Sequence, residues 1–406
     1  MGTVNNDDLF APEVVANPYP YFDGLRREDP VHWNEKYELW VISRYDHLEW
    51  VTGHHDLFSS QFLKRDRRPP YPPVPESEMA LFEMVRDYQS KWMLQQDRPE
   101  HLEQRMVLHE HFTPKAVESW RNPVRSAVKE LLDVAEEKGR VDLMRDFAVP
   151  LPLLVISQMM GIPVHDRPYV RSLAENLLFT GRPDADRFHN ILLGIKGMYE
   201  YLAPLAEERM ANPGDDLLSV LVDGERRGVF TREEVLADGT LLLLGGHETT
   251  IHLICNGTLA LLSHDNQWEL LREDPEGRAY WATEECLRYD APVKSVIRIA
   301  VQDVELAGKL IRKDDRVRAF ISSANRDPLK FRDANEFDIS RHPNPHVAFS
   351  SGIHHCLGAN LARLEGQEVF KALALRFPKM RLESDRLEYE PSINFRALKR
   401  LPVSLN

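Results

Sequence analysis

Several features are scarce in this chain, and each scarcity excludes a class of protein. Its 406 residues include three cysteines without paired spacing, which argues against a disulfide framework and for a reducing compartment. The first 22 residues contain neither a basic stretch nor an apolar core, so they do not resemble a signal peptide. The longest apolar-rich stretch, residues 151–164, contains Ser157 and Gln158 and is too short to span a bilayer. We therefore expect a cytoplasmic protein without a membrane anchor.

Positive charge is also in deficit. The chain carries 51 lysines and arginines against 64 aspartates and glutamates, a net charge of −13, and this balance gives no reason to expect nucleic acid as a partner. Neither an internal repeat nor a long low-complexity segment is visible. With 43% hydrophobic and 28% charged residues, the composition is that of a soluble globular protein. We expect one domain over residues 1–406 and a monomer.

Helical periodicity dominates the chain from residue 99 onwards. The pattern predicts helices over residues 18–29, 45–53, 99–111, 115–138, 143–160, 166–181, 187–211 and 231–263. It predicts short strands over residues 31–33 and 39–43, within 298–322 and within 380–406. Five prolines in residues 69–75 exclude a helix or a central strand there. The sequence therefore predicts a mainly α fold with a smaller β-rich region.

One cysteine stands in a setting that favours chemistry. Residues 349–358 read FSSGIHHCLG, and the leucines that follow Cys356 recur at helical spacing, so a helix begins near this cysteine. A helix N-terminus lowers the pKa of a thiol and favours the thiolate, which is the form that binds metals. Gly352 allows a tight turn, and Gly358 lets the backbone approach a flat ligand. Cys255 and Cys286 lie in apolar helical stretches and are interpreted as buried structural thiols.

A second unusual stretch, LLLLGGHETT at residues 241–250, lies in a helix that is apolar almost all round. Two glycines in a helix cost about 1 kcal/mol each relative to alanine, and a buried carboxylate costs more unless it is paired. A sequence that tolerates Gly245, Gly246 and Glu248 there usually does so for function. The alternative is structural: the glycines permit a close helix crossing, and Thr249 bonds to the carbonyl four residues earlier.

These two stretches resemble the cysteine-ligand loop and the oxygen-binding helix of cytochromes P450, and the resemblance covers nearly the whole chain. It implies the cytochrome P450 fold, a triangular helical prism, and a haem b (iron protoporphyrin IX) with Cys356 as its axial ligand. An axial thiolate favours cleavage of the O–O bond. In this reading Gly245 makes room over the haem, Thr249 hydrogen-bonds the bound oxygen, and Glu248 helps to supply protons. Phe349 belongs to the cysteine loop.

Further matches support the resemblance. Four positions match the family's partners for the haem propionates, namely His101, Arg105, Arg298 and His354. Glu285 and Arg288, three residues apart on a helix, share a face and can pair. With Arg341 they match a Glu–Arg–Arg cluster that holds the loop before the cysteine. The main departures are Ser350, where bacterial relatives often carry glycine, and the proline-rich segment 69–75.

The resemblance implies a soluble, bacterial-type monooxygenase that inserts one oxygen atom of O₂ into a C–H bond of a hydrophobic small molecule, such as a secondary metabolite. One alternative is a P450 that catalyses oxidative ring coupling, epoxidation or desaturation, and another is a haem-thiolate sensor or carrier without turnover. By family position, apolar residues line the substrate pocket: Met79, Phe82, Phe179, Leu244, Val293, Val296 and Phe395. Residues 77–95 are expected to become ordered over the substrate.

Electrons must come from another protein in this interpretation. No dinucleotide fingerprint follows a strand, and no cysteine cluster remains for an iron–sulfur centre. We expect NAD(P)H to supply electrons through an external ferredoxin and ferredoxin reductase. Such ferredoxins are acidic and this chain carries −13, so docking requires a local basic patch on the cysteine side. The candidates are Arg105, His109, Lys115 and Arg363.

Overall fold

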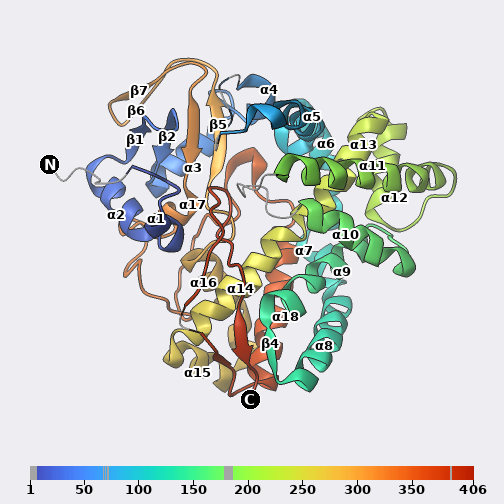
Figure 1. Cartoon of the computed structure of the whole chain (residues 1–406), viewed down its shortest axis with the longest axis vertical. Helices are drawn as coiled ribbons and strands as arrows, with labels where there is room; N and C mark the ends of the chain where they lie inside the picture. Colours follow the sequence, from blue (N-terminus) through green and yellow to red (C-terminus); the bar gives the residue numbers. More distant parts are fainter. Residues whose placement is uncertain (1–6, 67, 69, 71–72, 178–185, 385) are drawn as a thin grey trace.

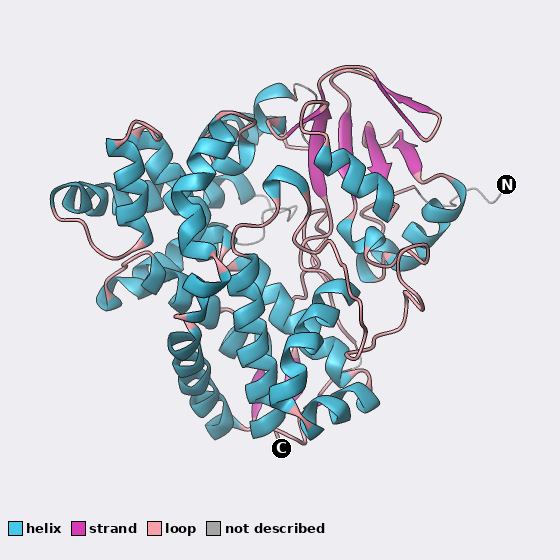
Figure 2. Cartoon of the chain, turned by 180° about the vertical axis from the view of Figure 1, so that it is seen from behind, coloured by secondary structure: helices cyan, strands magenta, loops and turns pink. Residues whose placement is uncertain are grey.

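Helices make up most of the molecule, and the larger sheet lies at one corner beside the N-terminus (Figures 1 and 2). The structure, a computed structural model, describes residues 7–406 except 67, 69, 71–72, 178–185 and 385. The predicted fold class, mainly α with a smaller β-rich region, is confirmed. Among the described residues no helix is both long and apolar enough to cross a membrane.

The α-helices divide into those of the N-terminal half and those of the C-terminal half of the chain. The first group is α1 (Pro12–Ala16), α2 (Tyr19–Glu28), α3 (Tyr45–Gly53), α4 (Phe62–Arg65), α5 (Met79–Gln89), α6 (Glu100–His109), α7 (Pro114–Glu118), α8 (Arg121–Lys138), α9 (Pro150–Met159), α10 (Arg167–Leu177) and α11 (Arg187–Ala211). The second is α12 (Leu217–Arg226), α13 (Arg232–Gly245), α14 (Glu248–Leu262), α15 (Asp265–Glu273), α16 (Pro275–Tyr289), α17 (Ile321–Ala324) and α18 (Ala359–Arg376).

The strands are β1 (Val31–Asn34), β2 (Leu39–Ile42), β3 (Phe58–Ser59), β4 (Arg140–Asp142), β5 (Val296–Ala300), β6 (Val304–Leu306), β7 (Lys309–Ile311), β8 (Arg316–Ala319), β9 (Arg381–Leu382) and β10 (Pro402–Ser404). A five-stranded sheet has the order β1-β2-β8-β5-β3, in which only β2 and β8 run parallel. Strand β2 reads LWVI and is buried along its whole length, as expected for a central strand. This sheet positions β5, which carries Arg298.

Helix α14 is the central element of the helical part. It reads ETTIHLICNGTLALL and is buried on almost every side, and it packs against α16 and α18. Cys255 on α14 and Cys286 on α16 are both buried, which confirms their interpretation as core thiols. Helix α18 follows the cysteine loop and packs closely on α16, so the loop is anchored to the densest part of the core.

The prediction of one helix over residues 231–263 was wrong. The structure has two helices, α13 and α14, which are separated at Gly246 and His247. The amide of His247 bonds to the carbonyl of Leu244, three residues back instead of four, and its φ and ψ of −101° and −68° depart from helical values. The glycines that seemed to be tolerated within a helix therefore mark the place where it breaks.

Other predicted helices differ in their details. The helix predicted over 143–160 begins with a π-helical turn, Met144–Ala148, and continues as α9. The helix predicted over 115–138 is divided into α7 and α8. Of the helix predicted over 166–181, the structure describes the part that forms α10. Pro150 is the first residue of α9. The amide at this position has no acceptor within the helix, so the missing N–H of proline costs no hydrogen bond.

Candidate functional site

The loop that carries Cys356 is held in one shape by its backbone. The amide of Cys356 donates to the carbonyl of Phe349 at 2.9 Å. Gly352 has φ +72°, and a Cβ on it would lie 2.1 Å from the carbonyl oxygen of Thr52 on α3, so only glycine fits this turn. Cys356 is exposed and lies three residues before the first residue of α18. The predicted position near a helix start is confirmed.

The predicted thiol pKa is not confirmed. Desolvation raises the pKa of Cys356 above its ordinary value of 9.0, although the Gly358 amide, Arg105 and Arg363 each act to lower it. The helix N-terminus therefore does not by itself produce a thiolate. A bound metal cation deprotonates a coordinating thiol outright.

Ser350, the departure from the family pattern, has φ +59°. A non-glycine residue in this region is uncommon, and the Ser350 hydroxyl is buried without a hydrogen-bond partner among the described residues. The adjoining residue is better satisfied, since the Ser351 hydroxyl lies 2.5 Å from that of Thr52. Ser350 thus costs some stability, and the loop tolerates it because its neighbours are fixed.

The break between α13 and α14 assigns the two glycines different roles. A Cβ on Gly246 would lie 3.1 Å from Ile156 on α9, so Gly246 permits the helix crossing. A Cβ on Gly245 would meet no atom within 4 Å. The Thr249 hydroxyl donates to the Gly245 carbonyl at 2.9 Å, as in the structural alternative. Its oxygen lone pairs still accept hydrogen bonds. Glu248 is buried.

Four cationic and imidazole side chains from separate parts of the chain meet beside the cysteine loop: His101 and Arg105 of α6, Arg298 of β5, and His354. We call them the His/Arg cluster. The rings of His101 and His354 lie 3.9 Å apart between centroids. Arg105 donates to the carbonyl of His355 at 2.6 Å, and Arg298 donates to the carbonyl of Ile297 at 2.8 Å. The four residues predicted as one constellation do converge.

The four residues of the His/Arg cluster carry no negative charge themselves, and the carboxylate of Asp97 acts on His101 and Arg298. Burial and the neighbouring arginines lower the pKa of His101 to about 4 and that of His354 to about 2. Burial also lowers the pKa of Arg298 to about 10. Nδ1 of His101 and Nε2 of His354 are buried without a hydrogen-bond partner in the described chain. Such a cluster is satisfied only by an anion that brings several acceptor oxygens.

This donor set fits a haem. Cys356 offers an exposed sulfur for iron, and the His/Arg cluster offers donors for the two propionates. At Gly358 and Gly245 a Cβ would meet nothing within 4 Å, which leaves room for a flat ligand against the backbone. The unpartnered ring nitrogens of His101 and His354 support a haem independently of the cysteine loop, because no residue of the described chain forms a hydrogen bond with them.

The structure brings Glu285, Arg288 and Arg341 together in the core. Arg288 pairs with both carboxylate oxygens of Glu285 at 2.7 and 2.8 Å, and Arg341 reaches the same carboxylate at 3.3 Å. Both members of the first pair have fully buried side chains. Arg288 also donates to the carbonyls of Asn325, Ala334 and Glu336. We call Glu285, Arg288 and Arg341 the Glu285 cluster. It holds the irregular segment that leads to the cysteine loop.

The predicted pocket residues are only partly brought together. Val293 forms a β-bridge with Phe395. Phe82 of α5 makes an edge-on contact with Phe188 of α11, at 5.2 Å between ring centroids. Leu244 is buried at the end of α13, Val296 begins β5, and Met79 begins α5. Phe179 lies outside the described residues. The grouping of these seven residues as a substrate pocket stays a prediction.

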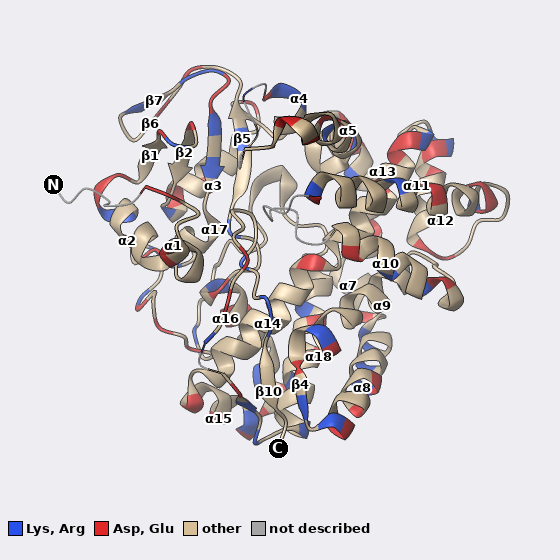
Figure 3. Cartoon of the chain, in the orientation of Figure 1, with Lys and Arg blue, Asp and Glu red and all other residues tan. Residues whose placement is uncertain are grey.

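The proposed basic patch needs correction. Arg363 forms a two-point ion pair with Glu284 at 2.7 and 3.2 Å and stacks on Phe349. Arg105 is directed to the cysteine loop. Figure 3 shows acidic and basic residues interleaved along the outer helices. Only His109 and Lys115 remain as exposed candidates.

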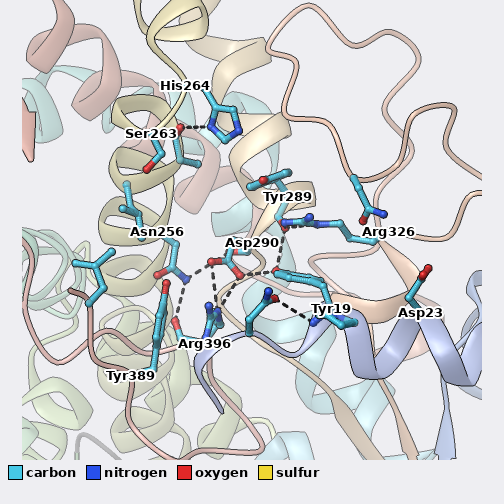
Figure 4. A pocket seen from close by; sticks show the side chains of 16 residues that line it. Tyr19, Asp23, Asn256, Ser263, His264, Tyr289, Asp290, Arg326, Tyr389 and Arg396 are labelled. Carbon is cyan, nitrogen blue, oxygen red and sulfur yellow. Dashed lines mark hydrogen bonds and ion pairs between the residues drawn. The ribbon is translucent and has the colours of Figure 1, made fainter. Parts of the chain in front are cut away.

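A cleft of about 530 Å³ lies elsewhere, between α2, the end of α14 and the C-terminal segment (Figure 4). Arg396 pairs with Asp290 at 3.2 Å, and Tyr19 donates to the same carboxylate at 2.5 Å. Arg326 lies between the rings of Tyr19 and Tyr289, 3.7 and 3.6 Å from their centroids. These charges satisfy one another, so the cleft does not resemble a haem or substrate site.

The sequence interpretation missed two residues of α14, His252 and Asn256. Both are buried, and each has at least one polar atom without a hydrogen-bond partner among the described residues. The signal in the sequence was present: they are polar residues in a helix that is otherwise apolar.

Comparisons agree with this geometry. The family model Cytochrome P450 matches residues 280–398. The biotin biosynthesis cytochrome P450 of Bacillus subtilis (strain 168) is 35% identical over 97% of both chains. The cytochrome P450 monooxygenase PikC of Streptomyces venezuelae is 37% identical over 96% of this chain and 92% of its own. Similarity thus extends well beyond the residues of the family model.

Solved structures resemble the whole chain as well. P450BioI, in complex with an acyl carrier protein ligated to hexadec-9Z-enoic acid, has a TM-score of 0.86 at 33% identity and covers 97% of this chain and 99% of its own. CYP109E1 from Bacillus megaterium, in complex with testosterone, has a TM-score of 0.84 at 31% identity and covers 98% and 100%. The fold, and not only the cysteine loop, is shared.

Proposed function

Since the chain belongs to the cytochrome P450 family and is a monooxygenase, we propose that it inserts one atom of O₂ into a C–H bond of a hydrophobic small molecule. The observation that carries the proposal is the His/Arg cluster beside exposed Cys356, because its unpartnered nitrogens fit propionates. The relatives that act in polyketide and biotin biosynthesis support a substrate from secondary metabolism.

Each part of the site then has a defined task. Cys356 binds the iron, and His101, Arg105, Arg298 and His354 hold the propionates. When bound, haem supplies the oxidising chemistry of iron and O₂. The Thr249 hydroxyl donates to the Gly245 carbonyl, so its oxygen would accept a hydrogen bond from a group bound at the haem site. In this proposal Glu248, the preceding residue, passes protons to that position.

The substrate side is apolar and is formed by segments distant in sequence. In this proposal Val293 and Phe395, which form a β-bridge, belong to one wall, and Phe82 of α5, which contacts Phe188, belongs to another. Apolar walls exclude water and bind a hydrophobic body, while few polar groups orient it. Relatives whose solved structures contain testosterone or a C16 acyl chain show that this fold accommodates large apolar ligands. Both compounds are therefore suitable probes.

Electrons reach the haem from a separate ferredoxin and its reductase in this proposal. The outward face of α6 is the best docking surface, because its Arg105 touches the cysteine loop. Leu102 and Met106 on this face are 43% and 55% exposed, and His109 and Lys115 lie at its end. An apolar centre with a few cations suits an acidic electron carrier, whose association is faster at low ionic strength.

The test is turnover of testosterone and of hexadec-9Z-enoic acid with NADPH, with and without ferredoxin and ferredoxin reductase, at two ionic strengths. We expect oxygenated product only with both proteins present, and a slower rate at the higher salt concentration. Mass spectrometry separates insertion of one oxygen from desaturation or coupling. CO binding without NADPH consumption under every condition would contradict the proposal and favour a sensor or carrier.

A further inference from the structure

Three polar residues follow one another on a single face of α14, behind Thr249. Glu248, His252 and Asn256 are spaced four residues apart, so their side chains are neighbours along the helix. All three are buried, with 3%, 1% and 1% of their surface exposed. In the part of the chain that the structure describes, both ring nitrogens of His252 and the side-chain oxygen of Asn256 lack a hydrogen-bond partner. We call Glu248, His252 and Asn256 the polar row.

The polar row is covered by the C-terminal segment. The ring of Phe395 lies 5.8 Å from that of His252, between centroids. The Asn256 amide nitrogen donates to the carbonyl of Arg396 at 2.8 Å, so its oxygen faces away from that carbonyl. The ring of Phe395 and the Arg396 backbone thus cover this side of the row without bonding to the ring nitrogens of His252 or to the side-chain oxygen of Asn256.

One end of the polar row opens to a surface cleft. Asn256 is one of the residues that line the cleft of about 530 Å³, together with Ser263, His264 and Tyr389 (Figure 4). From Asn256 to Glu248 the helix rises about 12 Å, at 1.5 Å per residue. The other end is Glu248, whose neighbour Thr249 bonds to the helix break. The row thus extends from the wall of the cleft to the acid that we assign to proton supply.

We propose that the polar row is a water-filled path that carries protons from the cleft of Figure 4 to Glu248. The proposal rests on the role given above to Glu248 and Thr249. Side chains one helical turn apart are about 5–6 Å from each other at Cβ, and a bridging water satisfies two polar groups that are too distant for a direct bond. Unpartnered buried polar atoms destabilise a fold, and ordered water is their usual partner.

The proton transfers balance along the row. The Asn256 oxygen accepts a hydrogen bond and orients a water, but it carries no proton itself. That water gives a proton to one ring nitrogen of His252 while the other ring nitrogen releases one toward Glu248. Each proton that Glu248 passes on is replaced from the cleft, so the row has the same charge before and after. His252 is neutral at rest, because burial lowers its pKa to about 3.

The first test is a high-resolution crystal structure of the haem-loaded protein. We expect ordered waters within hydrogen-bond distance of the Asn256 side-chain oxygen and of a His252 ring nitrogen. A dry row, with apolar atoms packed against both groups, would overturn the proposal.

The second test measures the fate of O₂ without added substrate. Ferredoxin, its reductase and NADPH drive the reaction, and the readout is the fraction of consumed O₂ that is released as hydrogen peroxide instead of water. His252→Phe and Asn256→Leu should raise this fraction at least twofold, because water formation needs more protons. His252→Asn, which keeps hydrogen-bonding groups, should lie between His252→Phe and the wild type.

The matched control is Thr258→Val. Thr258 is buried on α14 with an unpartnered hydroxyl, but it lies off the polar row, two residues beyond Asn256. It should leave the peroxide fraction unchanged. If Thr249→Ala raises the fraction but His252→Phe and Asn256→Leu do not, the path is overturned and the roles of Glu248 and Thr249 stand. If Thr249→Ala has no effect either, the proposed proton supply fails with it.

Discussion

Two groups of buried charged and imidazole side chains in this protein differ in where their partners come from. In the Glu285 cluster, Arg288 has a carboxylate and three backbone carbonyls of the same chain. In the His/Arg cluster, two ring nitrogens have no partner among the described residues, and the two arginines reach only backbone carbonyls. The first cluster stabilises the fold, and the second requires a ligand. Whether a charged or imidazole group has hydrogen-bond partners within the chain thus distinguishes structural from functional groups more clearly than burial does.

The largest expected effect follows from a substitution at the ligand site. Cys356→Ala should abolish the red-shifted Soret band of the reduced, CO-bound protein, because no other thiol can reach the iron. Cys255→Ala and Cys286→Ala should keep it, since both thiols are buried in the core. Absorbance spectra of the three variants check this prediction. A retained thiolate band in Cys356→Ala would show that the axial ligand lies elsewhere.

Next in size is a break of the structural cluster. Arg288→Met leaves the Glu285 carboxylate buried without its main cation, so the free energy of unfolding should fall by about 3–5 kcal/mol. Urea unfolding of the protein measures the loss. The control is Lys129→Ala, which removes an exposed ion pair with Asp133 and should cost less than about 1 kcal/mol. Equal losses in the two variants would contradict the assigned role of the Glu285 cluster.

A third variant separates the two clusters directly. His354→Leu removes a partly buried imidazole that has one unpartnered nitrogen and one backbone hydrogen bond, with Gln96, so the haem-free protein should be about as stable as the wild type. With haem bound, the loss of a charge-assisted hydrogen bond of about 1.5–3 kcal/mol should weaken binding at least tenfold. Thermal unfolding without haem and transfer of haem to apomyoglobin measure the two effects. A destabilised haem-free variant with unchanged haem retention would show that His354 is structural.

The smallest expected effect concerns Asp238 of α13, which has one carboxyl oxygen with a partner in the chain and one without. One of its oxygens accepts from the amide of Met93 at 2.7 Å, and the other has no partner among the described residues. Burial raises the pKa of Asp238 to about 8. The native carboxyl therefore keeps its proton while the unfolded one ionises near 3.8. Stability is full below about pH 4 and is lost as the pH rises towards 8.

Asp238→Asn should remove this pH dependence. We expect the variant to be more stable than the wild type at pH 8 and equal to it near pH 4. Urea unfolding at both values checks the prediction. A wild type whose stability does not change between pH 5 and pH 8 would contradict it.

Local pattern predicted much of the fold and most of the site. Periodicity located α3, α11 and the strands around β8, because amphipathic spacing is a local property of the chain. It failed at 231–263, where the Gly245–Gly246 pair ends one helix and the bond from Thr249 to Gly245 supports the start of the next. A propensity summed over a window does not detect such a break, since the apolar residues on both sides continue the helical pattern.

The sequence by itself predicted which residues carry the chemistry. The cysteine loop, the Gly-Gly-His-Glu-Thr stretch and the Glu285–Arg288 spacing are short-range patterns, which can be recognised from the sequence alone. The tertiary structure alone decided which charges are satisfied. It paired Arg363 with Glu284, it left His101 and His354 without an anion, and it raised the pKa of Cys356. These outcomes depend on distance and desolvation between segments far apart in the chain, and no local pattern contains that information.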